Sequence, residues 1–248
     1  LNSNIAVPDY IMASNTTAGK LETAKKDFGI GITSDNKSVA RFADILILSV
    51  KPNKYKGVIE EIRNDVKKEA VIVTIAAGIK IKTIEAFFGK ELKVVRTMPN
   101  IAAVVGESMT ALCSNGQVTE EELKMIFDIF SSFGMVETVG EELMDVFTAI
   151  SSSPAVVYMF IEALADGAVL KGLPRDKAYR MASQVVLGAA KMVLATGKHP
   201  GQLKDSVCSP GGTSIEAVYT MEKYGFRGHV IEAMQRSTEK SESMGKNE

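Results

Sequence analysis

A regular alternation of short apolar runs and amphipathic segments fills the first 140 residues and restricts the fold more than any other feature. Residues 44–50 and 70–75 are continuous apolar runs rather than alternating ones. Such runs are typical of strands buried on both faces of a parallel sheet. Strands that alternate with helical patterns of about 10–15 residues predict βαβ units. We therefore expect an α/β fold with a mostly parallel, doubly wound sheet.

The same pattern predicts the individual elements of this sheet domain. Strands are expected at residues 10–14, 30–33, 44–50, 70–75, 92–96, 108–113 and 135–138. Helices are expected from Thr16 or Thr17 to Gly29, from Ser34 to Phe42, and at residues 53–67, 81–88 and 120–133. The last of these begins with Thr119 and Glu122, whose spacing predicts a capping box.

The pattern changes after Gly140, where the periodicity is helical throughout and no strand is predicted. Helices are expected at residues 141–150, 154–172, 175–196, 200–207, 213–224 and 227–243. We therefore expect an α/β domain at residues 1–140 and an all-α domain at residues 141–248. Residues 182–193 are rich in Ala, Val and Met with few charges, so we expect these helices to dock on another subunit.

Composition narrows the class of partner. The chain has 248 residues, a net charge of −1, 24% charged residues and 6% aromatic residues. This balance argues against nucleic acid as the main partner. The most apolar helix carries Glu162 and Asp166, so we expect no membrane span. Cys113 and Cys208 do not suggest a disulfide framework, and no signal peptide is recognised, so we expect a cytoplasmic protein.

A small polar loop at residues 208–214 is the strongest local indication of a site. Gly211 and Gly212 run directly into an amphipathic segment that begins at Thr213, so the loop lies at a helix N-terminus. Unpaired backbone N–H groups and the positive end of the helix dipole favour an anion there. Glycines let a ligand approach the backbone, while Ser209 and Ser214 supply hydroxyl groups. An ordinary capped helix start is the alternative.

A dinucleotide-binding sheet normally opens with a strand followed by Gly-x-Gly-x-x-Gly. No such motif precedes Tyr10, and residues 29–34 follow a helix and lack the third glycine. We interpret residues 29–34 as a helix stop followed by a short strand. If residues 10–14 form the second strand of the sheet, we expect the first strand and its phosphate-binding loop to lie upstream of Leu1.

The end of that second strand informs the choice of cofactor. NAD-binding proteins usually place Asp or Glu there to bind the ribose 2′-hydroxyl. This chain instead has Ser14, Asn15, Thr16 and Thr17, with Lys20 one helical turn further on. Because no carboxylate would repel a 2′-phosphate, we expect NADPH, with NADH as the other candidate. Arginine, a common partner of a 2′-phosphate, is absent from this segment.

Taken together, these motifs resemble the pyrroline-5-carboxylate reductase family over nearly the whole chain. The matching segments are residues 50–52, 76–78, 98–100, 105–107, 162–167, 172–175, 199–205, 207–212, 217–218 and 221–222. The most specific of them reads Val207-Cys208-Ser209-Pro210-Gly211-Gly212. The resemblance implies an N-terminal Rossmann domain and a helical C-terminal domain that dimerises by interleaving its helices. It also implies reduction of 1-pyrroline-5-carboxylate to proline with NAD(P)H, by a homodimer or a decamer of five dimers.

The resemblance further implies roles for individual residues. The residues expected to bind the cofactor are Ser14, Asn15, Thr16, Asn36, Val50, Lys51, Pro52, Ala76, Ala77, Gly78, Pro99 and Asn100. Gly211, Gly212, Thr213 and Ser214 are expected to bind the substrate, a small molecule with a carboxylate. Ser214 and Ser209 are the candidate catalytic residues, with Ser214 hydrogen-bonded to the imine nitrogen and Ser209 supporting the loop. No metal is expected.

Hydride transfer to a protonated cyclic imine depends on positioning more than on a strong acid, because the imine can take its proton from water. The chain has two histidines, His199 and His229. Each lies near the start of a predicted helix, and neither is expected to act as a catalytic acid.

Three departures from the family pattern stand out. Ser214 replaces a threonine, residues 151–155 read as one residue short of a Gly-Ser-Gly-Pro-Ala stretch, and the phosphate-binding motif is missing. Two other functions stay open. One is a reductase similar to the β-hydroxyacid dehydrogenases, although Lys171 and Lys191 lack the sequence context of that family's catalytic lysine. The other is a non-catalytic, dinucleotide-sensing scaffold.

Overall fold

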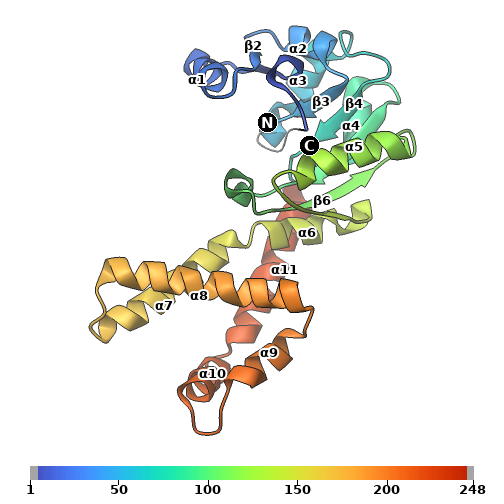
Figure 1. Ribbon diagram of the computed structural model, residues 1–248. Coiled ribbons are helices and arrows are strands. Elements are labelled where there is room, and N and C mark those ends of the chain that lie inside the picture. Colours follow the sequence, from blue (N-terminus) through green and yellow to red (C-terminus); the bar gives the residue numbers. More distant parts are fainter. Residues whose placement is uncertain (1–4, 245–248) are drawn as a thin grey trace. The chain divides into compact units, whose positions relative to one another are not determined.

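The computed structural model describes residues 5–244 (Figure 1). They form two compact units. The first, called here the sheet unit, contains residues 5–151 and 237–244, and the second, the helical unit, contains residues 152–236. The helical unit is therefore shorter than the 141–248 expected for a helical domain, because residues 141–151 and the end of the last helix pack with the sheet.

The sheet unit contains a two-stranded sheet and a five-stranded sheet. Strands β1 (Met12–Ser14) and β2 (Gly31–Thr33) pair in parallel with each other. The five-stranded sheet has the order β3-β4-β5-β6-β7, with bounds Ile45–Leu48, Val71–Thr74, Lys93–Met98, Ser108–Ser114 and Gly134–Thr138. Every pairing in it is parallel except β5 with β6. The prediction of a mostly parallel α/β sheet is confirmed.

The pairing also bears on the expected first strand. Within residues 5–244, β1 pairs only with β2, and β3 pairs only with β4, so each of β1 and β3 has one unpaired edge. In a Rossmann sheet the first strand lies between the second and the fourth. Among residues 5–244, no strand pairs with both β1 and β3, which is where the first strand of such a sheet lies. The interpretation of residues 29–34 is confirmed, since Gly29 ends helix α1 with φ 68° and β2 begins at Gly31.

Six α-helices accompany the strands of this unit. They are α1 (Ala18–Phe28), α2 (Asn36–Phe42), α3 (Tyr55–Ile62), α4 (Ile81–Phe88), α5 (Glu120–Ser131) and α6 (Met144–Ser151). Short 3₁₀ turns lie at Pro8–Tyr10 (η1), Pro52–Lys54 (η2), Ile101–Val105 (η3) and Glu141–Leu143 (η4). The capping box of Thr119 and Glu122 is confirmed. Ser34 was the wrong cap for α2, because the Asp35 carboxylate accepts the first free N–H groups of that helix.

Helices cover both faces of the five-stranded sheet. Alternate residues of a strand point to opposite faces, so Ile72 joins a different cluster from Val71 and Val73. The cluster around Ile72 includes apolar residues of α3, α4 and α6. The cluster around Val73 is closed by α5 through Ile126 and Phe130. Burying one large apolar side chain stabilises the folded state by about 1.5–3 kcal/mol. The two clusters therefore give this unit a core of its own.

The helical unit has a much smaller core. Its helices are α7 (Pro154–Leu170), α8 (Arg175–Thr196), α9 (Pro200–Val207), α10 (Thr213–Lys223) and α11 (Phe226–Met244), the last of which ends in the sheet unit. The buried apolar residues are Ala165, Ala178 and Ala182, where α7 and α8 pack together. As expected, the described residues after Gly140 contain no strand.

Large apolar side chains remain exposed on this unit. On α7 and α8, those more than half exposed are Tyr158, Met159, Leu170, Met181, Val185, Met192 and Leu194. One described stretch, Glu141–Leu170, is long and apolar enough to cross a membrane by length and composition alone, which the charges on α7 had not led us to expect. Only 6% of its most apolar window is buried within the chain, so this stretch presents a large apolar surface.

Candidate active site

The carboxyl ends of the parallel strands carry the residues predicted to bind a cofactor. Strand β1 ends at Ser14, β3 at Leu48, β4 at Thr74 and β5 at Met98. In open α/β sheets, ligands bind outside these ends. The predicted segments Val50-Lys51-Pro52, Ala76-Ala77-Gly78 and Pro99-Asn100 directly follow β3, β4 and β5. The structure therefore places them at the edge where a dinucleotide is expected, called here the cofactor edge.

A buried polar network holds three of these strand ends together. The Tyr55 hydroxyl donates to the Leu48 carbonyl oxygen at 2.6 Å and accepts from the Thr74 hydroxyl at 3.0 Å. The Thr97 hydroxyl donates to the Thr74 carbonyl oxygen at 3.1 Å. Burial raises the pKa of the Tyr55 hydroxyl, so it remains a neutral donor. These bonds fix the segments after β3 and β4, yet our reading of the sequence passed over all three side chains.

Asn36 is joined to the end of β1. The Ser14 hydroxyl donates to Asn36 Oδ1 at 2.7 Å, and Asn36 Nδ2 donates to Glu61 Oε2 at 3.0 Å. Next to them, the Asn15 side-chain oxygen accepts the backbone N–H of Thr17 at 2.9 Å, at the start of α1. Three of the predicted cofactor residues are thus gathered at one corner of the sheet unit.

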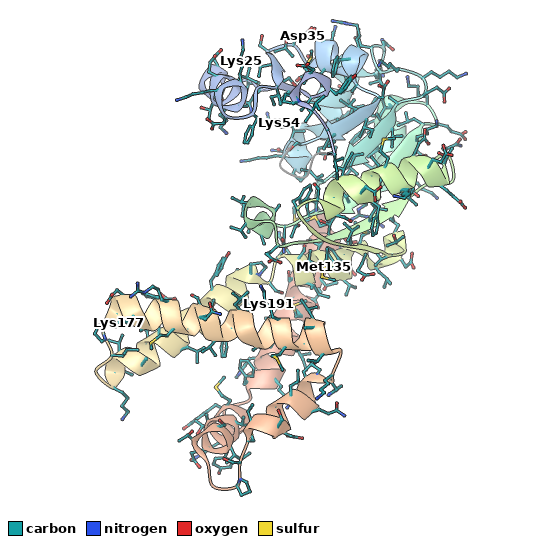
Figure 2. The ribbon with its side chains drawn as sticks, in the orientation of Figure 1. Lys25, Asp35, Lys54, Met135, Lys177 and Lys191 are labelled. Atoms are coloured by element: carbon teal, nitrogen blue, oxygen red, sulfur yellow. The ribbon has the colours of Figure 1, made fainter. Side chains whose placement is uncertain are left out.

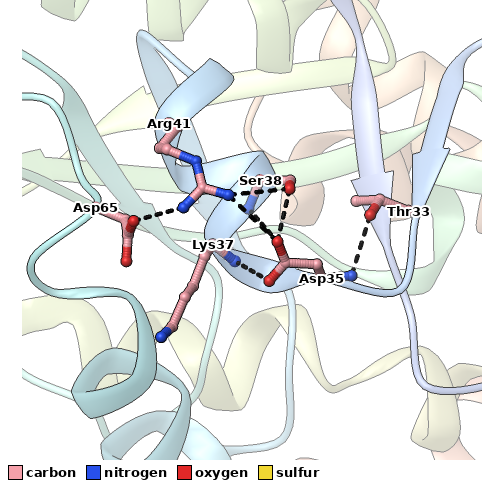
Figure 3. A network of polar contacts seen from close by, with 6 residues as sticks. All are labelled: Thr33, Asp35, Lys37, Ser38, Arg41 and Asp65. Atoms are coloured by element: carbon pink, nitrogen blue, oxygen red, sulfur yellow. Dashed lines mark hydrogen bonds and ion pairs between the residues drawn. The ribbon is translucent and has the colours of Figure 1, made fainter.

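A network of polar contacts around Asp35 holds the start of α2 (Figure 3). The Asp35 carboxylate accepts the Ser38 hydroxyl at 2.6 Å and the backbone N–H groups of Lys37 and Ser38. The Ser38 hydroxyl, followed by these N–H groups and the Arg41 guanidinium, lowers the pKa of this carboxyl. Arg41 also contacts Asp65 at 2.6 Å. The anchored turn fixes the first residue of α2, which is Asn36.

Asn100 and Lys51 behave differently at this edge. The Asn100 side-chain oxygen accepts the backbone N–H of Met109, and its own backbone N–H donates to the Ser108 hydroxyl. Asn100 therefore shapes the loop after β5 through bonds on both sides. Lys51 is exposed and begins the turn η2.

The second predicted site is the loop before α10, in the helical unit. Gly211 has φ 67°, in the left-handed region that favours glycine. A side chain at Gly212 would have its Cβ 2.4 Å from the Ser209 hydroxyl oxygen and 3.1 Å from the Ser209 carbonyl oxygen, so any larger residue would require Ser209 to move. Gly212 is the N-cap of α10, and no described side chain caps this helix end. Backbone N–H groups at Thr213 and beyond are thus available to an anion.

A cavity of about 1210 Å³ adjoins this loop within the helical unit. Gly211, Gly212 and Thr213 line it together with residues of α7, α9 and α10 and with Phe226 and Arg227. Ser209 and Ser214, the candidate catalytic residues, are exposed and do not line it. The structure thus brings three of the predicted substrate residues to the cavity and leaves both serine hydroxyls on the surface of the loop.

Both histidines lie at the start of a helix. His199 is the N-cap of α9, and its Nδ1 accepts the backbone N–H of Gly201 at 3.0 Å. His229 lies in the first turn of α11 beside Gly225. In the described part of the chain, no group of three or more His, Cys, Asp or Glu side chains could hold a metal ion.

These two sites define a class of protein. Residues 141–244 match the family model described as "Pyrroline-5-carboxylate reductase dimerisation", and residues 1–78 match "NADP oxidoreductase coenzyme F420-dependent". A nucleotide-binding sheet followed by a dimerisation domain is the plan of a nicotinamide-dependent oxidoreductase.

Similar proteins identify the family. The chain is 44% identical to the pyrroline-5-carboxylate reductase of Escherichia coli over 98% of the chain and 91% of that protein. It is 41% identical to that of Methanosarcina acetivorans over 99% of the chain and 92% of the protein. The crystal structure of the Plasmodium falciparum enzyme with NADP bound has a TM-score of 0.88 and 34% identity, covering 98% of this chain and 90% of that one. The chain belongs to the pyrroline-5-carboxylate reductase family.

Family membership sets aside the alternative of a β-hydroxyacid-dehydrogenase-like reductase. Its candidate lysines fit poorly as well. Lys171 directly follows the end of α7, and Lys191 is an exposed side chain on α8 (Figure 2).

Proposed function

We propose that this protein reduces 1-pyrroline-5-carboxylate to L-proline by hydride transfer from NADPH, in the last step of proline biosynthesis. The observation that carries the proposal is membership of the reductase family over nearly the whole chain. The open N-terminus of α10 behind Gly211 and Gly212 supports it, because a carboxylate is the substrate group that such a site would bind.

The cofactor edge fits a dinucleotide in its chemistry. Its strand-end segments are short and contain small residues such as Ala76 and Gly78. Small residues let a ligand approach the backbone closely. Ser14, Asn15 and Thr16 would face the adenosine ribose, and they carry no negative charge that would repel a 2′-phosphate. NADPH is therefore the preferred cofactor, with NADH as the weaker one. When bound, the cofactor supplies the hydride from C4 of its nicotinamide.

The substrate loop provides binding and orientation. The free backbone N–H groups at Thr213 and Ser214 hold the carboxylate, and the Ser214 hydroxyl hydrogen-bonds the ring nitrogen of the imine. Ser209 supports the loop through its carbonyl oxygen, which accepts the Gly212 N–H at 3.0 Å. No side chain acts as a strong acid, since the imine nitrogen takes its proton from water before the hydride arrives at the adjacent carbon.

The helical unit forms a homodimer in this proposal. Its exposed apolar residues on α7 and α8 are too numerous for an isolated soluble unit, and the matched dimerisation model covers the same helices. Packing of a second copy against them would account for the exposed stretch that resembles a membrane span. A decamer built from such dimers is the larger assembly, and we place the enzyme in the cytoplasm.

The test is an NADPH oxidation assay on the purified protein with two kinds of substrate. Turnover with pyrroline-5-carboxylate, and little with open-chain ketoacids, is the expected result. Turnover with ketoacids alone would favour a dehydrogenase of another specificity. Binding of NADPH without turnover of any substrate would favour the dinucleotide-sensing scaffold.

A further inference from the structure

A buried arginine on the middle strand of the sheet has no part in the function described so far. Arg96 lies on β5 and is 1% exposed. Its Nη1 is 3.4 Å from Glu141 Oε1, and its Nη2 is 3.5 Å from Asp145 Oδ1. Among the described residues, its Nε is the one buried side-chain nitrogen or oxygen without a hydrogen-bond partner. Burying a guanidinium is costly, so its presence calls for a reason.

The two carboxylates belong to the segments that join the sheet unit to the helical unit. Glu141 begins η4, and Asp145 lies on α6, which ends at Ser151, the last residue before the helical unit. Asp145 Oδ1 also accepts the Ser241 hydroxyl at 2.8 Å. Ser241 is buried and lies in the part of α11 that returns to the sheet unit. Arg96 therefore holds the outgoing and the returning segment on the same strand.

The same group of residues reaches the cofactor edge. Glu141 Oε1 accepts the backbone N–H of Ile81 at 2.7 Å. Ile81 is the first residue of α4, whose N-cap has no side-chain hydrogen bond of its own, and the predicted segment Ala76-Ala77-Gly78 lies just before it. Arg96 lies on β5, three residues before Pro99 and four before Asn100. Arg96 and Glu141 therefore lie next to two of the predicted cofactor segments.

We propose that Arg96 is a positioning residue. With Glu141, Asp145 and Ser241, called here the clamp, it couples the cofactor edge to the two segments that carry the helical unit. The clamp thereby ties the position of those two segments to the strand that leads into Pro99 and Asn100. This inference rests on the proposed function.

The clamp should affect hydride transfer more than cofactor affinity. A displacement of about 1 Å at the reacting atoms can cost about 100-fold in rate. The cofactor edge lies wholly in the sheet unit, so the Kd for NADPH depends less on the connecting segments. A residue that served only the stability of the core would lower the Tm and leave kcat of the folded enzyme unchanged.

Three variants loosen the clamp in different ways. Arg96→Met removes the charge and keeps the length, and Ser241→Ala removes only the bond from α11. Glu141→Gln removes a charge while keeping a side-chain oxygen for the Ile81 N–H. The matched control is Lys124→Met, which breaks an exposed ion pair with Asp128 on α5. For each variant we would measure kcat, the KM for pyrroline-5-carboxylate, the Kd for NADPH, and hydrogen exchange at residues 81–88 and 237–244.

Arg96→Met is expected to lower kcat by about 10- to 100-fold, with smaller losses in Glu141→Gln and Ser241→Ala. The Kd for NADPH should stay within about twofold, and exchange at residues 237–244 should rise, because coupling acts through those segments. Lys124→Met should match the wild type in every readout.

Unchanged kcat in a folded Arg96→Met enzyme would overturn the proposal, and so would a loss of NADPH affinity as large as the loss of kcat. If Arg96→Met does not fold, the same two criteria apply to Glu141→Gln and Ser241→Ala. If the wild type does not turn over pyrroline-5-carboxylate, the proposed function fails separately. Exchange then decides the clamp, which is rejected if residues 237–244 exchange at the wild-type rate in the folded variants.

Discussion

The sheet unit and the helical unit bury their apolar residues to different extents. Ile72 and Val73, neighbours on β4, are both fully buried, on opposite faces of one sheet. In the helical unit, Met159 on α7 is 68% exposed and Val185 on α8 is 65% exposed. A helix stabilises a fold by burying its apolar side, and these helices have little of their own chain to bury it against. The sheet unit buries most of its apolar residues against its own chain, whereas much of the apolar surface of α7 and α8 is left exposed.

The two predicted sites differ in the same way. Buried side chains such as Tyr55 and Thr74 hold the cofactor edge, and their hydrogen bonds lie inside the sheet unit. The loop before α10 is held by its own backbone, through the hydrogen bond from the Gly212 N–H to the Ser209 carbonyl oxygen. Ser214 on this loop is exposed. The predicted cofactor segments are thus fixed by buried side chains, whereas the predicted substrate loop lies at the surface of the chain.

The largest expected effect comes from placing a charge on the exposed face of α8. Val185→Glu would bury a carboxylate in the dimer interface, so the dimer should dissociate at least about 100-fold more readily, a change of about 3 kcal/mol. Sedimentation velocity over a range of concentrations measures this. The matched control is Met125→Glu, since Met125 is 53% exposed on α5 of the sheet unit. A Val185→Glu protein that remains as dimeric as the control would contradict the assignment of the interface.

The next effect concerns the hydroxyl on the substrate loop. Ser214→Ala should lower kcat/KM for pyrroline-5-carboxylate by about 10- to 100-fold, because one hydrogen bond to the reacting ring is lost. The Kd for NADPH, measured by fluorescence titration, should not change. Ser214→Thr keeps a hydroxyl at this position and should retain activity close to that of the wild type. Wild-type kinetics in Ser214→Ala would remove this residue from the site.

A smaller effect is expected within the cofactor edge. Tyr55→Phe leaves the Leu48 carbonyl and the Thr74 hydroxyl without their buried partner, which should cost about 1–3 kcal/mol of unfolding free energy. NADPH affinity should fall in the same variant, since the segments after β3 and β4 lose their support. Urea unfolding and NADPH titration test both. Tyr10→Phe, at a tyrosine that is 78% exposed, should change neither quantity.

The smallest effect is a pH dependence in the core of the sheet unit. Burial, aided by the Glu141 carboxylate, raises the pKa of the Cys113 thiol from 9.0 to about 11. Because the folded state holds this proton more tightly than the unfolded state, the stabilisation is complete below about pH 9 and is lost as the pH rises towards about 11. Between about pH 8 and about pH 10 the wild type should lose about 1 kcal/mol more than Cys113→Ala. Equal losses in urea unfolding would show that the thiol does not contribute.

The order and type of the elements could be predicted because the apolar pattern is locally determined. The continuous run at residues 70–75 identified a strand buried on both faces, and the helical periodicity after Gly140 identified the second half. The run at residues 44–50 also gave a strand, but Ile47 on it is exposed. The cap of α2 could not be resolved, since Ser34 and Asp35 are adjacent and both suit an N-cap. The carboxylate side chain reaches two N–H groups at once, which the pattern of apolar residues does not indicate.

The cofactor edge could be predicted in position but not in its support. Parallel strands end at one edge, so the segments after them are found directly from the strand pattern. The bonds of Tyr55 to Thr74 and of Glu141 to Ile81 join residues far apart in the sequence, and only the folded arrangement brings them together. The exposure of Ser214 likewise depends on how the loop turns at Gly211.

The most direct test of the account follows the transferred hydride itself. NADPH carrying deuterium at C4 of the nicotinamide would be incubated with the protein and pyrroline-5-carboxylate, and the product examined by mass spectrometry and NMR. The account predicts proline with deuterium on the carbon that was double-bonded to nitrogen, with one NADPH consumed per proline formed. Proline without deuterium, or no proline while NADPH remains bound, would contradict it.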